Sequence, residues 1–169
     1  MSMLLCDFHI HTTWSDGSVD LPEVVDIYGQ AGFDVISITD HVYNSDSTIG
    51  SWAERLNKTI AEEIFPGYME TLEREAERAM ARYGMLLIPG VEITKNYLSE
   101  EESAHVLLLD LKRYVSADLG WEEIFREANH LYSWKTLLPC LKNVEAVKEC
   151  IRDNRGVAIT MFRNGTARE

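Results

Sequence analysis

The stretch "DFHIHTTWSDG", residues 7–17, sets the problem of this fold. Two of the chain's five histidines, His9 and His11, stand two residues apart directly after an apolar start. Side chains alternate between the two faces of a strand, so we expect Asp7, His9 and His11 to point the same way. Three polar side chains on one face of a buried strand need polar partners from elsewhere in the chain.

Size and charge limit the possible classes of protein. The 169 residues suit a single domain, residues 1–169, with a real core. The opening residues lack the pattern of a secretory leader, and no apolar run approaches the roughly 18 residues that span a bilayer, so we expect a cytoplasmic protein. Twenty-eight acidic residues against sixteen basic ones give a net charge of -12. This charge disfavours nucleic acid and anionic membranes as partners but leaves a small anionic substrate open. The oligomeric state is not set by the sequence.

Short apolar runs alternate with helix-like stretches, which predicts an α/β fold with a mainly parallel sheet. We expect strands at residues 4–10, 34–40, 85–94, 105–111, 134–139 and 157–162. We expect helices at residues 21–32, 51–83, 120–130 and 143–156. Asp20 should cap the first helix and Gly32 should end it. Pro66 and Gly67 should interrupt the second, because proline removes an amide donor.

Polar residues gather at the ends of the predicted strands: His9, His11, Asp40, His41 and Glu92. In parallel α/β folds the carboxyl ends of the strands converge on the ligand site. His105 instead opens its strand. It can reach the same place only if that strand runs antiparallel or the sheet is irregular.

This set of residue types points to a metal. A lone histidine near a strand is usually a satisfied polar side chain, but several at one kind of location favour a shared site. Imidazole nitrogens with carboxylate oxygens suit zinc, manganese or iron, whereas calcium and magnesium favour oxygen alone. The three cysteines include no CxxC pair, which argues against a thiolate zinc site.

Four segments, "FHIHTTWSDGS", "ISITDH", "PGVEIT" and "AHVLLLDL", resemble the motifs of the PHP (polymerase and histidinol phosphatase) family. The resemblance covers about residues 5–111. It implies an irregular (β/α)7 barrel with two or three divalent metal ions at the strand ends. It also implies hydrolysis of phosphate esters, the commonest activity in the family.

The resemblance implies six metal ligands: His9, His11, Asp16, His41, Glu92 and His105. In this assignment the HxH histidines bind the first metal, Glu92 bridges two metals, Asp16 and His41 serve a further ion, and His105 completes the second metal's shell. Asp40 is the candidate catalytic residue, which would either orient a ligand or accept a proton. Asp7 would either play the same part as Asp40 or make an ordinary hydrogen bond in a loop or at a strand end.

The expected activity is therefore that of a metal-dependent hydrolase acting on a small phosphorylated substrate. Divalent cations lower the pKa of a water molecule, which attacks phosphorus while the cations neutralise the developing charge. Lys95 is a candidate for holding a phosphate oxygen, although an exposed surface lysine is the commoner situation. Trp14 either walls the site or only packs. Two other functions stay open: a catalytically weak metal-binding or interaction module, and a different metallohydrolase reaction.

The chain departs from the family after His105. Family members are longer and carry a late histidine, often in an HP pair, and a late Asp-x-His, which this sequence lacks. The segments that would flank them meet near residue 129. Three explanations stay open: the middle is deleted, it exists in the molecule but not in this sequence, or another subunit completes the site. His130 either replaces a missing ligand or is a surface histidine.

Overall fold

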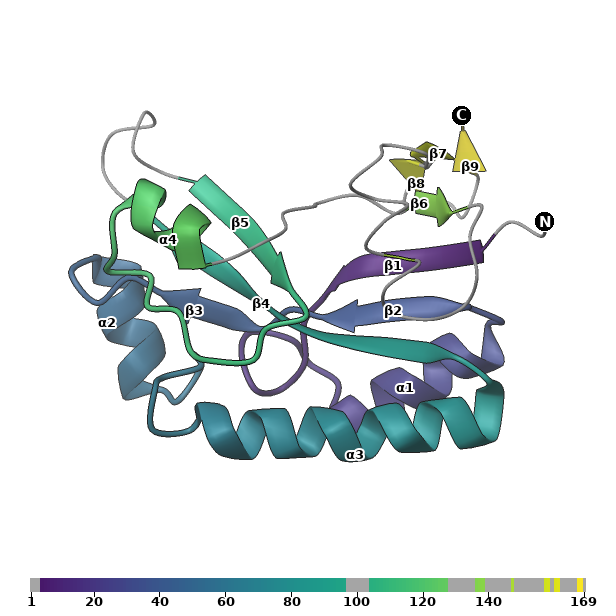
Figure 1. Ribbon diagram of the computed structural model, residues 1–169. Coiled ribbons are helices and arrows are strands. Elements are labelled where there is room, and N and C mark those ends of the chain that lie inside the picture. The colour runs from purple at the N-terminus through teal and green to yellow at the C-terminus, as the bar shows by residue number, and fades with distance from the viewer. Residues whose placement is uncertain are drawn as a thin grey trace.

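The computed structural model describes residues 4–96 and 104–127, with short segments at 136–138, 147, 157–158, 160–161 and 167–168 (Figure 1). The helices are α1 (Leu21–Gln30), α2 (Thr48–Arg55), α3 (Phe65–Tyr83) and α4 (Trp121–Glu127). The longer strands are β1 (Leu4–Ile10), β2 (Val35–Ile38), β3 (His41–Tyr43), β4 (Leu86–Lys95) and β5 (Ala104–Leu109). The shorter ones are β6 (Thr136–Leu138), β7 (Val157–Ala158), β8 (Thr160–Met161) and β9 (Ala167–Arg168).

Strand β4 organises the sheet. Its first half pairs in parallel with β2, its second half pairs in parallel with β3, and β5 pairs with it antiparallel. The order is β3-β4-β2-β1-β6-β7. Strand β1 is parallel to β2, β6 is antiparallel to β1, and β7 is antiparallel to β6. The fold is thus mixed α/β with a parallel centre, as expected. The pairings between the described strands leave the sheet open, so they do not form the expected closed barrel.

Helices α1 and α3 cover one face of this sheet (Figure 1). The larger core cluster lies there and includes Ile36, Leu72 and Val91. A second cluster includes Phe8, Val35 and Ile88, and along β2 and β4 its members Val35 and Ile88 stand next to Ile36 and Leu87 of the first cluster. The sheet is therefore apolar on both faces, which fits a buried parallel sheet.

The first helix follows its predicted signals. The Asp20 carboxylate accepts a hydrogen bond from the amide of Glu23 at 2.9 Å, and Pro22 lies in the first turn, where its missing N–H costs nothing. The helix ends at Gln30, two residues before the predicted end, and Gly32 follows with a φ of 81°. The predicted N-cap is confirmed.

The prediction of one helix over residues 51–83, interrupted at Pro66 and Gly67, is wrong. The chain forms α2 and α3, and the break lies at residues 56–64, where Asn57 has a φ of 51°. Pro66 does not break a helix but lies in the first turn of α3, a position that favours proline. The predicted strand 34–40 is also too long, since β2 ends at Ile38 and a separate strand, β3, starts at His41.

Later predictions are tested only in part. Strand β6 lies within the predicted strand 134–139, and β7 and β8 lie within 157–162 but belong to different sheets. The predicted helix 143–156 and residues 128–130 of the predicted helix 120–130 lie outside the described residues, except for Val147. Among the described helices, none has both the length and the apolar character needed to cross a membrane.

We predict that Gly50→Ala destabilises the fold although alanine favours helices. A Cβ at Gly50, within α2, would lie 1.9 Å from the carbonyl oxygen of Asn44, so the backbone would have to move. Such overpacking should lower the free energy of unfolding by about 1–3 kcal/mol in urea denaturation. Gly67→Ala, where the added Cβ meets open space, is the matched control and should be neutral or stabilising. Equal stability of the two variants would contradict this packing.

Candidate metal centre

Glu92 lies near the end of β4, in register with His41 on β3 and Leu107 on β5. Its neighbours Val91 and Ile93 belong to the helix-side core, so alternation turns Glu92 to the opposite face. The Glu92 side chain is only 1% exposed. Strands on both edges of β4 therefore fix the position of a buried carboxylate.

Four imidazoles surround this carboxylate. Glu92 Oε2 lies 2.9 Å from His9 Nε2, 2.8 Å from His11 Nε2 and 3.5 Å from His41 Nδ1. Glu92 Oε1 lies 2.7 Å from His105 Nδ1. The two oxygens thus face different histidines.

Asp16 joins the cluster from the loop after β1. Its Oδ1 lies 2.8 Å from His11 Nδ1 and 3.5 Å from His41 Nε2. The loop can fold this closely because residue 17 is glycine: a Cβ there would lie 2.6 Å from the backbone carbonyl of His11. Among the described residues, two groups of ligand atoms are close enough to hold a metal ion: His9-His11-Glu92 and His11-Asp16-His41.

His105 reaches the cluster in the way that the sequence required. Strand β5 runs antiparallel to β4, so its first residues lie beside the last residues of β4. His105 pairs with Thr94, and its Nε2 lies 3.2 Å from Asn96 Oδ1. The structure therefore brings all six predicted ligand residues to one place.

The expectation that Asp7, His9 and His11 share a face is wrong for Asp7. Between the pairs Asp7–Ile36 and Ile10–Ile38, β1 advances three residues and β2 only two, so β1 contains a bulge. Asp7 turns toward α1, where its Oδ2 accepts a hydrogen bond from Tyr28 at 2.9 Å. Its Oδ1 accepts from the backbone amide of His9 at 3.2 Å, so Asp7 supports the strand beneath the cluster.

Asp40 is fully buried and holds the loop that carries Asp16. Its Oδ1 accepts hydrogen bonds from the amide of Thr12 at 2.7 Å and from the Ser15 hydroxyl at 2.6 Å. Its Oδ2 accepts from the Thr12 hydroxyl at 2.8 Å. Burial raises the pKa of Asp40, and these hydrogen bonds oppose that rise. The contacts indicate that Asp40 orients the loop.

Sequence reasoning missed Thr94. Its hydroxyl lies 2.6 Å from His41 Nδ1, so a proton on that nitrogen would leave Nε2 free to act as a ligand beside Asp16. The available signal was position: Thr94 stands two residues after Glu92 and so shares its face. Tyr43 was missed for the same reason, since it stands two residues after His41 and their ring centroids are 4.6 Å apart.

The donor set fits a cation better than it fits hydrogen bonding alone. His11 Nε2 and Glu92 Oε1 are buried without a hydrogen bond of acceptable geometry, although each has a neighbour within 2.8 Å. Such convergence without hydrogen-bond alignment is what ligands of a shared ion would show. Imidazole nitrogens with carboxylate oxygens suit zinc, manganese or iron.

The protonation states of Glu92 and His41 suit ligands. Burial would raise the pKa of Glu92, but the imidazoles of His11 and His9 and the charge of His41 more than compensate, so its pKa is lowered. Burial, and then the charge of His11, lowers the pKa of His41 to about 4. At neutral pH Glu92 is therefore ionised and His41 neutral, the forms that bind metals.

Three other predicted residues have different outcomes. Lys95 is buried, not exposed: its ammonium donates to the carbonyl of Leu119 and lies 4.8 Å from the centre of the Trp121 ring. Trp14 packs edge-on against Tyr68 at 5.5 Å, which favours its packing role. His130 lies outside the described residues.

Comparison with known proteins finds a similarity among solved structures. No family model matches the sequence, and no curated protein matches it either. Among solved structures, the chain is similar to a two-domain protein from Bacteroides vulgatus ATCC 8482 described as containing a predicted PHP-like metal-dependent phosphoesterase, with 26% sequence identity and a TM-score of 0.51. The similarity covers 76% of this chain but only 32% of that protein. It supports a PHP-like fold.

We predict that Asp40→Ala destabilises the metal-free protein more than the loss of an exposed helix cap does. The substitution leaves the buried amide of Thr12 without its acceptor, which costs about 1–3 kcal/mol of unfolding free energy. Asp40→Asn should cost less, because its carbonyl can still accept from that amide. Asp20→Ala, which removes the cap of α1, is the comparison at about 1 kcal/mol. If urea denaturation shows that Asp40→Ala has a free energy of unfolding equal to or higher than that of Asp20→Ala, the anchoring role of Asp40 is refuted.

Proposed function

We propose that this chain carries the metal centre of a hydrolase that cleaves phosphate esters of small molecules. The observation that supports it best is the convergence of four imidazoles on the buried Glu92 carboxylate. The similar solved protein, described as containing a predicted metal-dependent phosphoesterase, agrees with this reaction class. The open sheet that the described strands form would then be an incomplete PHP barrel.

Glu92 is proposed as the bridging ligand. Its Oε2 faces His9 and His11, whereas its Oε1 faces His105, so each oxygen can serve a different ion. Asp16 and His41 form a second group around the far nitrogen of His11. We propose that His9 and His11 serve the first ion, that Glu92 and His105 extend to the second, and that Asp16 and His41 serve a further ion.

Divalent cations held here would polarise the phosphate ester and acidify a water molecule. The chain's own residues position these ligands: Asp40 holds the loop of Asp16, and Thr94 fixes the ring of His41. The side chains of His9, Asp16 and His105 are 42%, 59% and 49% exposed, whereas that of His41 is 6% exposed. We therefore propose that a substrate approaches from the side of these three residues.

A second candidate function has its own support in the sequence. The late histidine and the Asp-x-His motif of the family are missing from it, which would leave fewer ligands per ion. Too few ligands weaken metal affinity. A metal-binding or interaction module with little catalytic activity would have this composition.

We predict that hydrolysis of 4-nitrophenyl phosphate depends on Glu92 and on bound metal. Substitution of a residue that only supports a metal ligand lowers metal affinity or activity by about 10–100-fold. Because Glu92 would bind the metal directly, Glu92→Gln should lower the rate of hydrolysis by at least about 100-fold. Elemental analysis of the same samples should show less metal per chain than in the wild type. Glu73→Gln, on the exposed side of α3, removes the same charge and should change neither value.

The outcomes separate the two candidate functions. Turnover that disappears on chelation and returns with zinc, manganese or iron supports the hydrolase. Stoichiometric metal without any turnover favours the binding module. Full activity after chelation, or in Glu92→Gln, contradicts a metal centre at this position.

A further inference from the structure

Strand β4 places more than a carboxylate beside the histidines of the cluster. Glu92 and Thr94 lie on one face of this strand, and Asn96 follows two residues later, directly after the strand ends. His41 pairs with Glu92 from β3, and His105 pairs with Thr94 from β5. The end of β4 therefore offers each of these two histidines a neutral polar neighbour in addition to the carboxylate.

The Thr94 hydroxyl contacts His41 as an acceptor. Thr94 Oγ1 lies 2.6 Å from His41 Nδ1, in a geometry that suits a hydrogen bond. The hydroxyl donates to the backbone carbonyl of Glu92 at 3.5 Å, so its lone pairs face the imidazole. Neutral His41 therefore carries its proton on Nδ1 and presents the lone pair of Nε2, which lies 3.5 Å from Asp16 Oδ1.

Asn96 contacts His105 at the other ring nitrogen. Asn96 Oδ1 lies 3.2 Å from His105 Nε2, again in a geometry that suits a hydrogen bond. A carboxamide oxygen only accepts, so this contact requires a proton on Nε2 and leaves a lone pair on Nδ1. Nδ1 lies 2.7 Å from Glu92 Oε1, yet that oxygen is buried without a hydrogen bond of acceptable geometry. Two lone pairs at this distance repel each other unless a cation lies between them.

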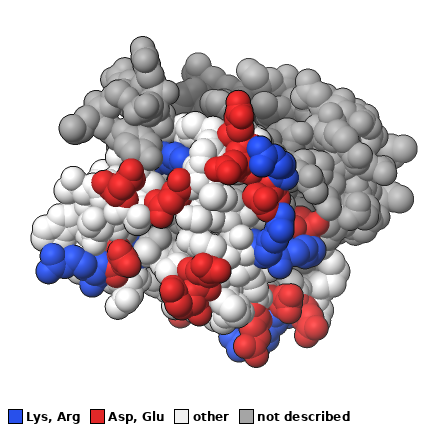
Figure 2. All heavy atoms as spheres, turned by 60° about the vertical axis from the view of Figure 1, so that its left-hand side comes forward, with Lys and Arg blue, Asp and Glu red and all other residues white. Residues whose placement is uncertain are grey.

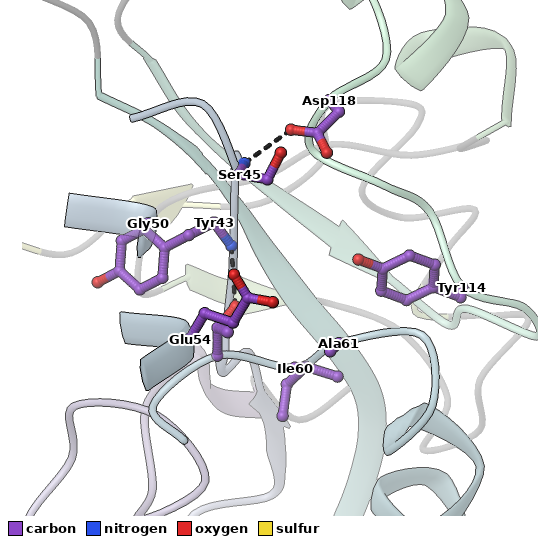
Figure 3. A pocket seen from close by; sticks show the side chains of 9 residues that line it. Tyr43, Ser45, Gly50, Glu54, Ile60, Ala61, Tyr114 and Asp118 are labelled. Atoms are coloured by element: carbon purple, nitrogen blue, oxygen red, sulfur yellow. Dashed lines mark hydrogen bonds between the residues drawn. The ribbon is translucent and has the colours of Figure 1, made fainter. Parts of the chain in front are cut away.

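The backbone at Asn96 is held by the segment that follows β3. The amide of Asn96 donates to Asn44 Oδ1 at 3.3 Å. Asn44 is fully buried, and its Nδ2 donates to Asp46 Oδ1 at 2.6 Å, which sets the orientation of that carboxamide. The next residue, Ser45, donates its amide to Asp118 Oδ1 at 2.7 Å, as the dashed line in Figure 3 shows. None of these bonds uses the side chain of Asn96.

The charge of this side of the molecule favours a cation between the two lone pairs. Figure 2, which brings the side of α2 and β3 forward, shows several Asp and Glu side chains across the surface. The whole chain has a formal net charge of -12. Such a surface attracts cations and repels anions.

We propose that Thr94 and Asn96 are positioning residues that select opposite tautomers of two metal ligands, so that His41 binds through Nε2 and His105 through Nδ1. The selection directs His41 toward the ion near Asp16, and it directs His105 toward the ion that it shares with Glu92. The inference rests on the metal centre of the proposed function but not on its reaction.

The first test identifies the tautomers directly. In isotope-labelled protein loaded with zinc, long-range proton–nitrogen correlation spectra show which ring nitrogen carries the proton. We expect the proton on Nδ1 of His41 and on Nε2 of His105. Asn96→Leu removes the acceptor at a similar size and should abolish the single Nε2–H form of His105, whereas Asn96→Asp should retain it. A proton on Nδ1 of His105, or no response of this ring to zinc, would overturn the inference.

The second test measures zinc affinity by competition with a chromophoric chelator. Asn96→Leu and Thr94→Val should each weaken zinc binding by about 10- to 100-fold, as the loss of a residue that supports a metal ligand does. Asn96→Asp and Thr94→Ser keep an acceptor oxygen and should restore most of the affinity. Thr71→Val is the matched control: it removes a hydroxyl that donates to the carbonyl of Gly67 within α3, and it should leave zinc affinity unchanged.

A double-mutant cycle separates positioning from a general structural role. In a His105→Ala background, Asn96→Leu should no longer change zinc affinity, because it acts through that ring. An equal loss in both backgrounds would refute the role of Asn96. If the tautomers and affinities are as expected but no ester is hydrolysed, only the proposed function fails. If hydrolysis requires metal but His105 binds it through Nε2, only this inference fails.

Discussion

The centre depends on one constraint, a buried carboxylate held between strands on both edges of β4. The side chains of Val91 and Ile93 are buried against α1 and α3. Because side chains alternate along a strand, Glu92 and Thr94 lie on the other face of β4. A carboxylate that is 1% exposed is tolerable only with charged or strongly polar partners. The surrounding imidazoles supply them, and they also keep the pKa of Glu92 low despite its burial.

Strand direction explains how distant histidines reach this carboxylate. His9 and His11 arrive from the carboxyl end of β1, and His41 comes from β3, which runs parallel to β4. His105 comes from the opposite end of its own strand, because β5 is antiparallel. A single antiparallel strand, β5, thus adds the candidate ligand His105 to a cluster whose other members come from the ends of parallel strands.

The sequence predicted the ends of β1 and β4 to within one residue, because buried strands and polar termini differ sharply in composition, but it placed the end of β2 two residues too late. It could not reveal the bulge in β1, since one extra residue leaves the apolar pattern of "LLCDFHI" unchanged while it turns Asp7 toward Tyr28. Pro66 was ambiguous, because proline both ends helices and begins them. The burial of Lys95 depends on the carbonyl of Leu119, a partner 24 residues away that no local pattern indicates.

Asp16 shows why the residues beneath the candidate ligands matter as much as the candidate ligands do. Its side chain is 59% exposed, so solvent contacts alone would leave it many conformations. The loop that carries it is tied to Asp40, which is fully buried and accepts three hydrogen bonds from Thr12 and Ser15. An exposed candidate ligand on a buried anchor can meet solvent while its backbone stays fixed. Rigidity at this centre therefore comes from a carboxylate that need not touch a metal ion.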